Sequence, residues 1–135
     1  KPNIVASACY LPFRDEVFQE IYCDPPHLIG MKYWSISPLQ SKVGYSRFGI
    51  WASKDEWLSF VDLVNNEFAR CLKYGGNLNF KLLDGVETHK NERTQFKDLN
   101  RLSNFKLARV KRKKSGIGNR YGLSTTIFAT YTHKS

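Results

Sequence analysis

Residues 53–83 decide how this chain folds, and they read SKDEWLSFVDLVNNEFARCLKYGGNLNFKLL. Ser53 and Glu56 form a capping box, in which the Ser53 side chain accepts a backbone hydrogen bond and the Glu56 side chain reaches back. An apolar stripe follows at helical spacing, made by Trp57, Phe60, Val61, Val64, Phe68, Cys71 and Leu72. Gly75–Gly76 predict the end of this helix, and Leu78–Leu83 predict a strand. The stretch is therefore typical of one long amphipathic helix that leads into a sheet.

Further elements are expected on both sides of this stretch. Branched and aromatic residues predict strands at Asn3–Tyr10, Leu28–Ser37, Val43–Ala52, Phe105–Arg112 and Tyr121–Thr132. Apolar residues at helical spacing predict a helix over Pro12–Tyr22, which Pro25 and Pro26 would stop. We also expect a turn at Asp84-Gly85 and a short helix over Glu92–Leu102. No repeat or low-complexity linker interrupts the 135 residues, so we expect a single domain at 1–135.

The expected fold class is α+β, with an antiparallel sheet, one long amphipathic helix and a C-terminal basic β-hairpin. The strand–helix–strand–strand–helix–strand order over residues 3–83 resembles a ferredoxin-like fold, and more specifically the RNA-recognition motifs. Tyr10-Leu11-Pro12-Phe13 is similar to the end of their first strand, and Arg47-Phe48-Gly49-Ile50-Trp51 is similar to their aromatic strand. The hairpin and helix around Ser53 are equally similar to the small sheet-plus-helix binders of single-stranded DNA. Both resemblances imply a partner that is single-stranded nucleic acid.

The net charge of +9 is confined to one end of the chain. Residues 1–98 hold twelve Lys or Arg and all twelve acidic residues, so this part is neutral. Residues 99–135 hold nine Lys or Arg and no acidic residue. This asymmetry favours a basic C-terminal segment, 99–135, that faces a polyanion.

The tip of the expected hairpin holds the densest cluster of cations. We expect Arg109, Lys111, Arg112, Lys113, Lys114 and Arg120 to contact phosphates, with Tyr121 stacking on a base. A solvated turn and a nuclear-import signal at Lys111–Lys114 are the alternatives for this cluster. Tyr45, Arg47 and Trp51 share one face of the strand at 43–52, so they are candidates for a second stacking surface. The leading hypothesis is therefore a nucleic-acid-binding protein that takes single-stranded RNA or DNA.

Signals for catalysis are thin, and no catalytic residue is assigned. Asp84, Glu87 and Lys90 have ExxK spacing rather than the ExK spacing of metal-dependent nucleases. Cys23 and His27 lack a second pair of ligands for zinc, so no metal site is expected. Neither GxxxxGK[ST] nor GxGxxG occurs, and no cofactor is expected.

Two other function classes stay open. The first is a small nuclease, either a ribonuclease or a toxin domain, that would act on RNA through His133 with Arg120 and Tyr121. The second is a protein-interaction module whose cationic end meets an acidic partner. Three unclustered cysteines favour a reducing compartment, so we expect an intracellular protein of the cytoplasm or nucleus. No apolar run approaches the length of a membrane span, and no membrane partner is expected.

Overall fold

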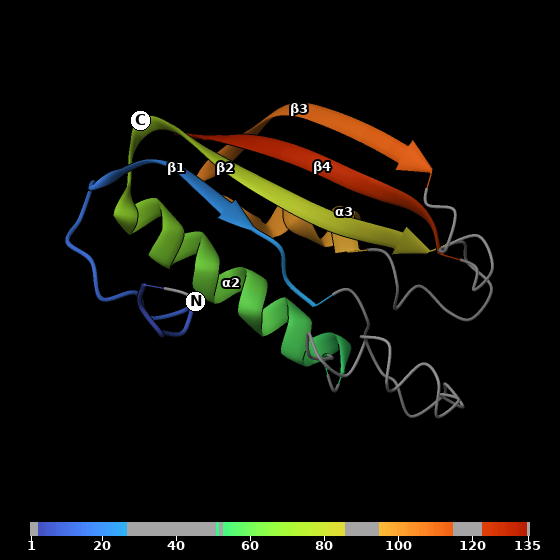
Figure 1. The fold of residues 1–135 in the computed structure, drawn as a ribbon, viewed down its shortest axis with the longest axis horizontal. Coiled ribbons are helices and arrows are strands. Elements are labelled where there is room, and N and C mark those ends of the chain that lie inside the picture. Colours follow the sequence, from blue (N-terminus) through green and yellow to red (C-terminus); the bar gives the residue numbers. More distant parts are fainter. Residues whose placement is uncertain (1–2, 27–50, 52, 86–94, 115–122, 135) are drawn as a thin grey trace.

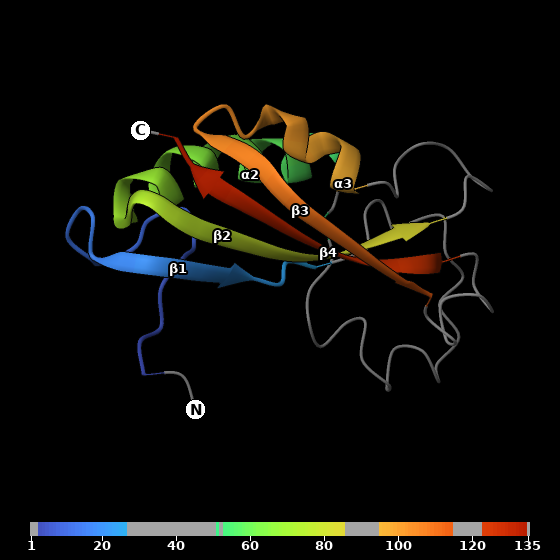
Figure 2. The ribbon, with the colours of Figure 1, turned by 90° about the horizontal axis from the view of Figure 1, so that it is seen from above.

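The computed structural model describes residues 3–26, 51, 53–85, 95–114 and 123–134. These residues form strand β1 (Phe18–Cys23), helix α2 (Lys54–Cys71), strand β2 (Leu72–Gly85), helix α3 (Gln95–Asp98), the 3-10 helix η3 (Leu99–Arg101), strand β3 (Phe105–Lys114) and strand β4 (Leu123–His133). The four strands make one sheet in the order β1-β2-β4-β3. Helices α2 and α3 lie on the same face of this sheet (Figure 1 and Figure 2).

The sheet is mixed rather than antiparallel. Strands β1 and β2 are parallel, and α2 forms the crossover between them. Strand β4 runs antiparallel to both β2 and β3. The predicted α+β class is confirmed, but the ferredoxin-like arrangement is wrong, because its first strand and first helix do not form where the sequence placed them.

Helix α2 begins where the sequence predicts. The Ser53 hydroxyl accepts a hydrogen bond from the backbone N–H of Glu56 at 3.2 Å, which caps the first turn. The buried side chains of α2 lie one helical turn apart and include Trp57, Val61, Val64, Phe68 and Cys71. The helix ends at Cys71 and not at the glycines, because Leu72 already has extended backbone angles and starts β2.

The core fills the space between the sheet and α2. Alternate residues of β2 and β4 turn inward and are almost completely buried: Leu78, Phe80, Leu82, Ile127, Ala129 and Tyr131. The residues between them, such as Asn79 and Phe128, point to the opposite side. We call this second side the open face, because no described helix covers it (Figure 2).

The N-terminal predictions are wrong. Residues 3–10 contain only an isolated bridge between Ser7 and Tyr10, and the predicted helix over 12–22 is replaced by turns followed by β1. The apolar residues of this segment fit helical spacing as well as strand alternation. Pairing with β2 favours the strand, because it satisfies the main-chain groups of β1 that face β2 and turns Ile21 toward the core.

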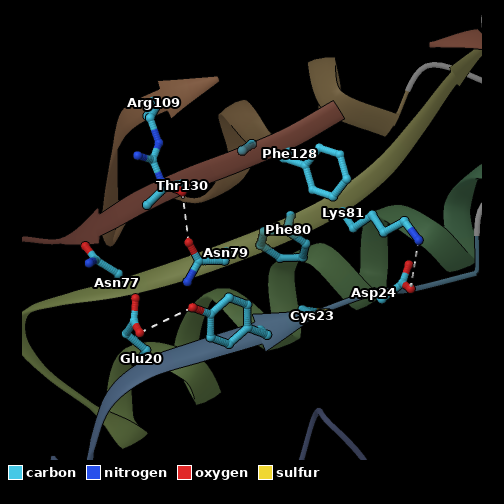
Figure 3. A pocket seen from close by; sticks show the side chains of 12 residues that line it. Glu20, Cys23, Asp24, Asn77, Asn79, Phe80, Lys81, Arg109, Phe128 and Thr130 are labelled. Carbon is cyan, nitrogen blue, oxygen red and sulfur yellow. Dashed lines mark hydrogen bonds and ion pairs between the residues drawn. The ribbon is translucent and has the colours of Figure 1, made fainter. Parts of the chain in front are cut away.

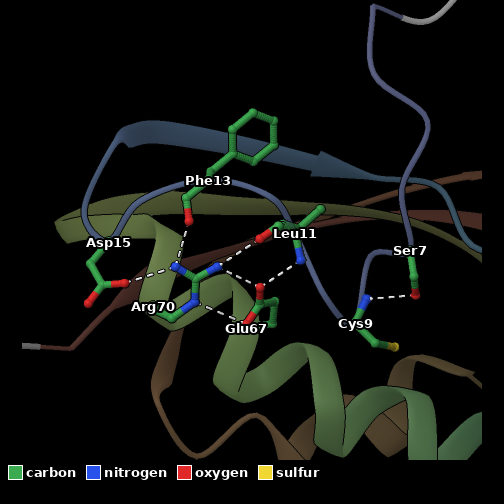
Figure 4. Close-up of polar contacts among 7 residues, drawn as sticks. All are labelled: Ser7, Cys9, Leu11, Phe13, Asp15, Glu67 and Arg70. Carbon is green, nitrogen blue, oxygen red and sulfur yellow. Dashed lines mark hydrogen bonds and ion pairs between the residues drawn. The ribbon is translucent and has the colours of Figure 1, made fainter.

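A polar clamp holds the segment before β1 against the last turns of α2 (Figure 4). The Arg70 guanidinium donates to the backbone oxygens of Phe13 at 2.7 Å and Leu11 at 3.0 Å. It also donates to Asp15 Oδ1 at 2.8 Å and to Glu67 Oε1 at 2.6 Å. Glu67 Oε1 in turn accepts from the backbone N–H of Leu11 at 2.7 Å. This network replaces the regular structure that the sequence predicted here.

The C-terminal half agrees better with the sequence. The predicted last strand pair is confirmed by β3 and β4, and the predicted helix over 92–102 is present in part as α3 and η3. Asp84-Gly85 belongs to β2 instead of a turn. The strands predicted at 28–37 and over most of 43–52, and the hairpin tip at 115–122, lie outside the described residues. No helix in the described ranges is long and apolar enough to cross a membrane.

Candidate functional site

The segment that follows the carboxyl end of β1 is held by side chains from two distant parts of the chain. Ligands of open α/β sheets bind outside the carboxyl ends of parallel strands, which is where Asp24 follows β1. Two residues later, the Pro26 carbonyl accepts hydrogen bonds from Trp51 Nε1 at 2.8 Å and from Gln95 Nε2 at 2.7 Å. Pro25, which lies between Asp24 and Pro26, is buried. Asp24 therefore leaves the sheet on a segment that two side chains hold in place.

Those two side chains are themselves anchored to α2. The Trp51 ring packs against Trp57 and Phe60, with ring centroids 5.6 and 4.9 Å away. Helix α3, which carries Gln95, is tied to α2 because Asp98 accepts from Trp57 Nε1 at 2.9 Å and pairs with the Lys54 ammonium. The Pro26 carbonyl is therefore bound by two side chains, one of which packs against α2 while the other lies on a helix that is hydrogen-bonded to α2.

Asp24 and Cys23 are the two chemically reactive groups at this end of β1. The Asp24 carboxylate is more than half exposed and lies 3.9 Å from the Lys81 ammonium. Burial, reinforced by the neighbouring Asp24 charge, raises the pKa of the Cys23 thiol to about 12. Cys23 is therefore a protonated thiol at neutral pH and a poor nucleophile, and the carboxylate is the group that can accept a proton.

A shallow hollow of about 480 Å³ extends from Asp24 across the open face (Figure 3). Two exposed rings, Tyr22 and Phe128, stand beside it. Polar side chains tie its floor together: Thr130 Oγ1 donates to Asn79 Oδ1 at 2.8 Å, and Asn79 Nδ2 reaches the Ile21 carbonyl at 3.4 Å. The hollow offers aromatic surface with amide and charged groups around it.

The predicted cations of β3 are split between the two faces of the sheet. Arg109 lines the hollow, and Lys111 and Lys113 pair with Phe128 and Thr126 in register on the same face. Arg112 turns the other way, with its guanidinium carbon 5.4 Å from the centre of the Phe96 ring. Lys114 pairs with Thr125 at the end of β3. The six-cation cluster of the sequence is therefore not one continuous surface.

The other predicted site residues are placed less informatively. Tyr45, Arg47, Arg120 and Tyr121 lie outside the described residues. The Trp51 ring packs against Trp57 and Phe60 on the helix side of the sheet. Its stacking on a nucleic-acid base stays a prediction.

His133, the candidate acid–base residue of the nuclease alternative, is buried. Its Nδ1 lies 3.2 Å from the Leu72 carbonyl oxygen, and its ring lies 4.9 and 5.4 Å from those of Tyr74 and Phe105. These contacts make it a structural residue. Within the described ranges, no group of three or more His, Cys, Asp or Glu side chains could hold a metal ion.

Sequence reasoning missed Asp24, Pro26 and Gln95. The pair of prolines was interpreted only as a helix stop, although an acidic residue directly after a short alternating run is also the signature of a strand that ends at a site. Gln95 carried no signal, because its contact with Pro26 joins residues 69 positions apart.

Neither a protein-family model nor a curated protein matches this sequence. Solved structures do match its fold. A SAM-dependent methyltransferase from Methanosarcina mazei aligns with 97% of this chain and 66% of its own, at a TM-score of 0.56 and 14% identity. The [4+2]-cyclase SpnF aligns with 96% of this chain and 54% of its own, at a TM-score of 0.55 and 14% identity. A protein from Thermus thermophilus assigned as a DNA modification methylase was solved in complex with S-adenosyl-L-methionine. It aligns with 92% of this chain and 49% of its own, at a TM-score of 0.52 and 15% identity.

These likenesses define the fold and correct the functional expectation. The chain has a methyltransferase-like fold and spans about half to two thirds of the length of the structures it matches. The matched proteins are a methyltransferase, a cyclase and a DNA modification methylase, and none of the three is a nuclease or a single-strand-binding module. Both of those functional predictions are therefore wrong.

Proposed function

We propose that this chain is the acceptor-side part of a methyl-transferring enzyme. The observation that carries the proposal is the fold match over nearly all of the chain to proteins named as methyltransferases. The carboxyl end of β1, where the segment 24–26 is locked by Trp51 and Gln95, is the site we assign to the methyl acceptor. Residues there would bind and orient an N–H or O–H group.

Asp24 has the chemistry that such an acceptor requires. A nitrogen or oxygen that gains a methyl group must lose a proton, and a carboxylate within hydrogen-bond reach can take it. The Lys81 ammonium lies 3.9 Å from this carboxylate and pairs with it. Cys23 is held protonated, which argues against a covalent route through a thiolate.

The described residues do not by themselves fit S-adenosyl-L-methionine. A nucleoside cofactor in this class of sheet is held by a tight glycine-rich turn between a parallel strand and a helix. Such a turn would lie between β1 and α2, and of that connection the structure describes only residues 24–26, 51 and 53, none of which is a glycine. We therefore derive no step through the cofactor.

The acceptor class we propose is an amino group carried by a nucleic acid. Arg109, Lys111 and Lys113 lie on the open face beside the hollow, and cations in a row suit a phosphate backbone. One of the matched structures is assigned as a DNA modification methylase. The role proposed for these cations is to present a methyl acceptor to Asp24.

The test is transfer of a labelled methyl group from S-adenosyl-L-methionine to DNA, RNA or small amines. It uses the gene product purified from the cells that make it. We expect Asp24→Asn to lose on the order of 100-fold in rate, because a positioned proton acceptor contributes at least that much. Asp62→Asn is the matched control, since Asp62 is an exposed carboxylate on α2 that pairs with Arg101. Absence of transfer with the parent, or full activity of Asp24→Asn, would refute the proposal.

A further inference from the structure

Gln95, the first residue of α3, is completely buried and only half of its amide is hydrogen-bonded. The Nε2 atom donates to the Pro26 carbonyl at 2.7 Å. The Oε1 atom accepts from no donor, and it is the one buried side-chain nitrogen or oxygen of the described residues in that state. A buried acceptor without a donor destabilises a fold by as much as one hydrogen bond stabilises it, or by more. The net contribution of this amide to stability is therefore small or negative.

The orientation of the amide is fixed by its partner. The Pro26 carbonyl oxygen can only accept a hydrogen bond, so the atom of Gln95 that lies 2.7 Å from it has to be the nitrogen. Turning the amide over would place two acceptor oxygens at this distance, where they repel each other. The unpaired Oε1 atom is thus a consequence of the bond to Pro26.

A second buried amide, Asn65 on α2, shows the opposite arrangement. Its Nδ2 atom donates to Ser103 Oγ at 3.1 Å, and its Oδ1 atom accepts from the backbone N–H of Asn104 at 3.0 Å. Both halves of this amide are paired while it joins α2 to the segment before β3. Such pairing is what a buried amide needs in order to stabilise a fold.

The Pro26 carbonyl does not depend on Gln95 for a hydrogen-bond partner, because Trp51 Nε1 also donates to it at 2.8 Å. A carbonyl oxygen has two lone pairs, and donors on both fix its position more closely than one donor does. Gln95 can act in this way because α3 is itself held on α2, where Asp98 accepts from Trp57 Nε1 at 2.9 Å. The second donor therefore adds precision to the segment 24–26.

We propose that Gln95 is a positioning residue of the acceptor site, which keeps the Asp24 carboxylate in place through the Pro26 carbonyl at the expense of stability. The inference rests on the proposed methyl transfer, because the role of Asp24 does. Residues at functional sites commonly break a rule of stable folding in this way. Since its side chain is completely buried, Gln95 acts through Pro26 and not on the methyl acceptor itself.

The test replaces Gln95 by methionine, which is unbranched, fills irregular space and brings no N–H group. We expect Gln95→Met to keep the thermal unfolding midpoint of the parent or to raise it, because the unpaired acceptor is gone and Pro26 retains its bond from Trp51. The kcat of methyl transfer should fall at least tenfold at a nearly constant KM, since a misplacement of about 1 Å can cost about 100-fold in rate.

Asn65→Leu is the matched control, and it should show the reverse pattern. It leaves the backbone N–H of Asn104 without its acceptor, so the unfolding midpoint should fall while kcat per folded molecule stays close to that of the parent. If Gln95→Met keeps the kcat of the parent, or lowers the unfolding midpoint as Asn65→Leu does, the amide has a structural role and the proposal is wrong.

A measurement that needs no methyl transfer keeps this inference apart from the proposed function. The ¹³C shift of the Pro26 carbonyl responds to hydrogen bonds on its oxygen, and it is read by NMR in the isotopically labelled gene product. We expect this shift and that of the Asp24 backbone amide to change in Gln95→Met and to stay the same in Asn65→Leu. Unchanged shifts in Gln95→Met would overturn this inference alone. Absence of methyl transfer with the parent would overturn the proposed function and this inference together.

Discussion

A single methyl group added at Gly76 should lower the free energy of unfolding, because the backbone leaves no space for a Cβ atom there. A Cβ atom built there would lie 2.8 Å from the Lys73 carbonyl oxygen and 2.9 Å from the Gln19 carbonyl oxygen. It would also lie 3.1 Å from Leu72 Cδ2. Two of these three atoms belong to the backbone, so they cannot rotate away. Because Gln19 is part of β1, Gly76→Ala forces β1 and β2 apart, and we expect a loss of about 2–3 kcal/mol in the free energy of unfolding.

The neighbouring Gly75 provides a matched control of a different kind. A Cβ atom there meets no other atom within 4 Å, but the residue has φ of +76°, which L-residues rarely adopt. Gly75→Ala should therefore lose only about 1 kcal/mol, which is the conformational cost of the left-handed region. Asparagine tolerates that region better than alanine, so Gly75→Asn should recover part of the loss. Gly76→Asn should not, because its Cβ atom makes the same clash.

The assay is urea unfolding followed by tryptophan fluorescence, since Trp57 is completely buried and reports loss of the core. The four variants and the parent are compared by their urea midpoints. Where the dependence of the free energy of unfolding on urea concentration has the same slope, a difference in midpoint measures a difference in stability. If Gly75→Ala is as destabilising as Gly76→Ala, the close approach of β1 to the start of β2 is not what the structure describes.

Three further outcomes are expected. Arg70→Ala should expose residues 11–17 to limited proteolysis, and acid should do the same to the parent. The Arg70 hydrogen bond lowers the pKa of Glu67, so this contribution to stability is full above the unfolded value of 4.5 and is lost as pH falls through the lowered folded value. Trp57→Phe should cost about 1.5–3 kcal/mol in urea unfolding through the lost bond to the α3 carboxylate alone, and an unchanged midpoint would contradict that bond. Cys23 should react with iodoacetamide at pH 8 far more slowly than a thiol in an unstructured peptide, as measured by mass spectrometry, and equal rates would refute its burial.

The parts of the fold that sequence reasoning predicted correctly are those that depend on local signals. The cap at Ser53 and the apolar stripe behind it act within a few residues, and α2 begins where they indicate. The pair β3 and β4 was also predictable, because each strand is rich in residues that favour extended backbone and the two are close in sequence. Strand β1 pairs with β2 across more than fifty residues, from Phe18 to Leu72, and no local signal encodes that partner.

The candidate site was harder to predict for the same reason. Asp24 is recognisable only once β1 is known to be a strand whose carboxyl end opens to solvent. The groups that fix Pro26 come from two distant segments, through Trp51 and Gln95. Composition and spacing can indicate that a carboxylate or an aromatic ring is present, but which atoms they touch depends on the tertiary fold.

The cations of β3 do not act as one cluster, because successive side chains of a strand point to opposite faces of the sheet and a count of charges does not contain that alternation. In a regular strand, Arg109 would share the inward face with Phe105 and Leu107. The register shift leaves Ala108 without a partner in β4, so Arg109 pairs with Thr130 and turns outward. One unpaired residue therefore decides that Arg109 lines the hollow beside Asp24, where a basic side chain can meet an anionic ligand. The same shift turns Val110 inward to the core, so a single irregularity in β3 serves both packing and the candidate site.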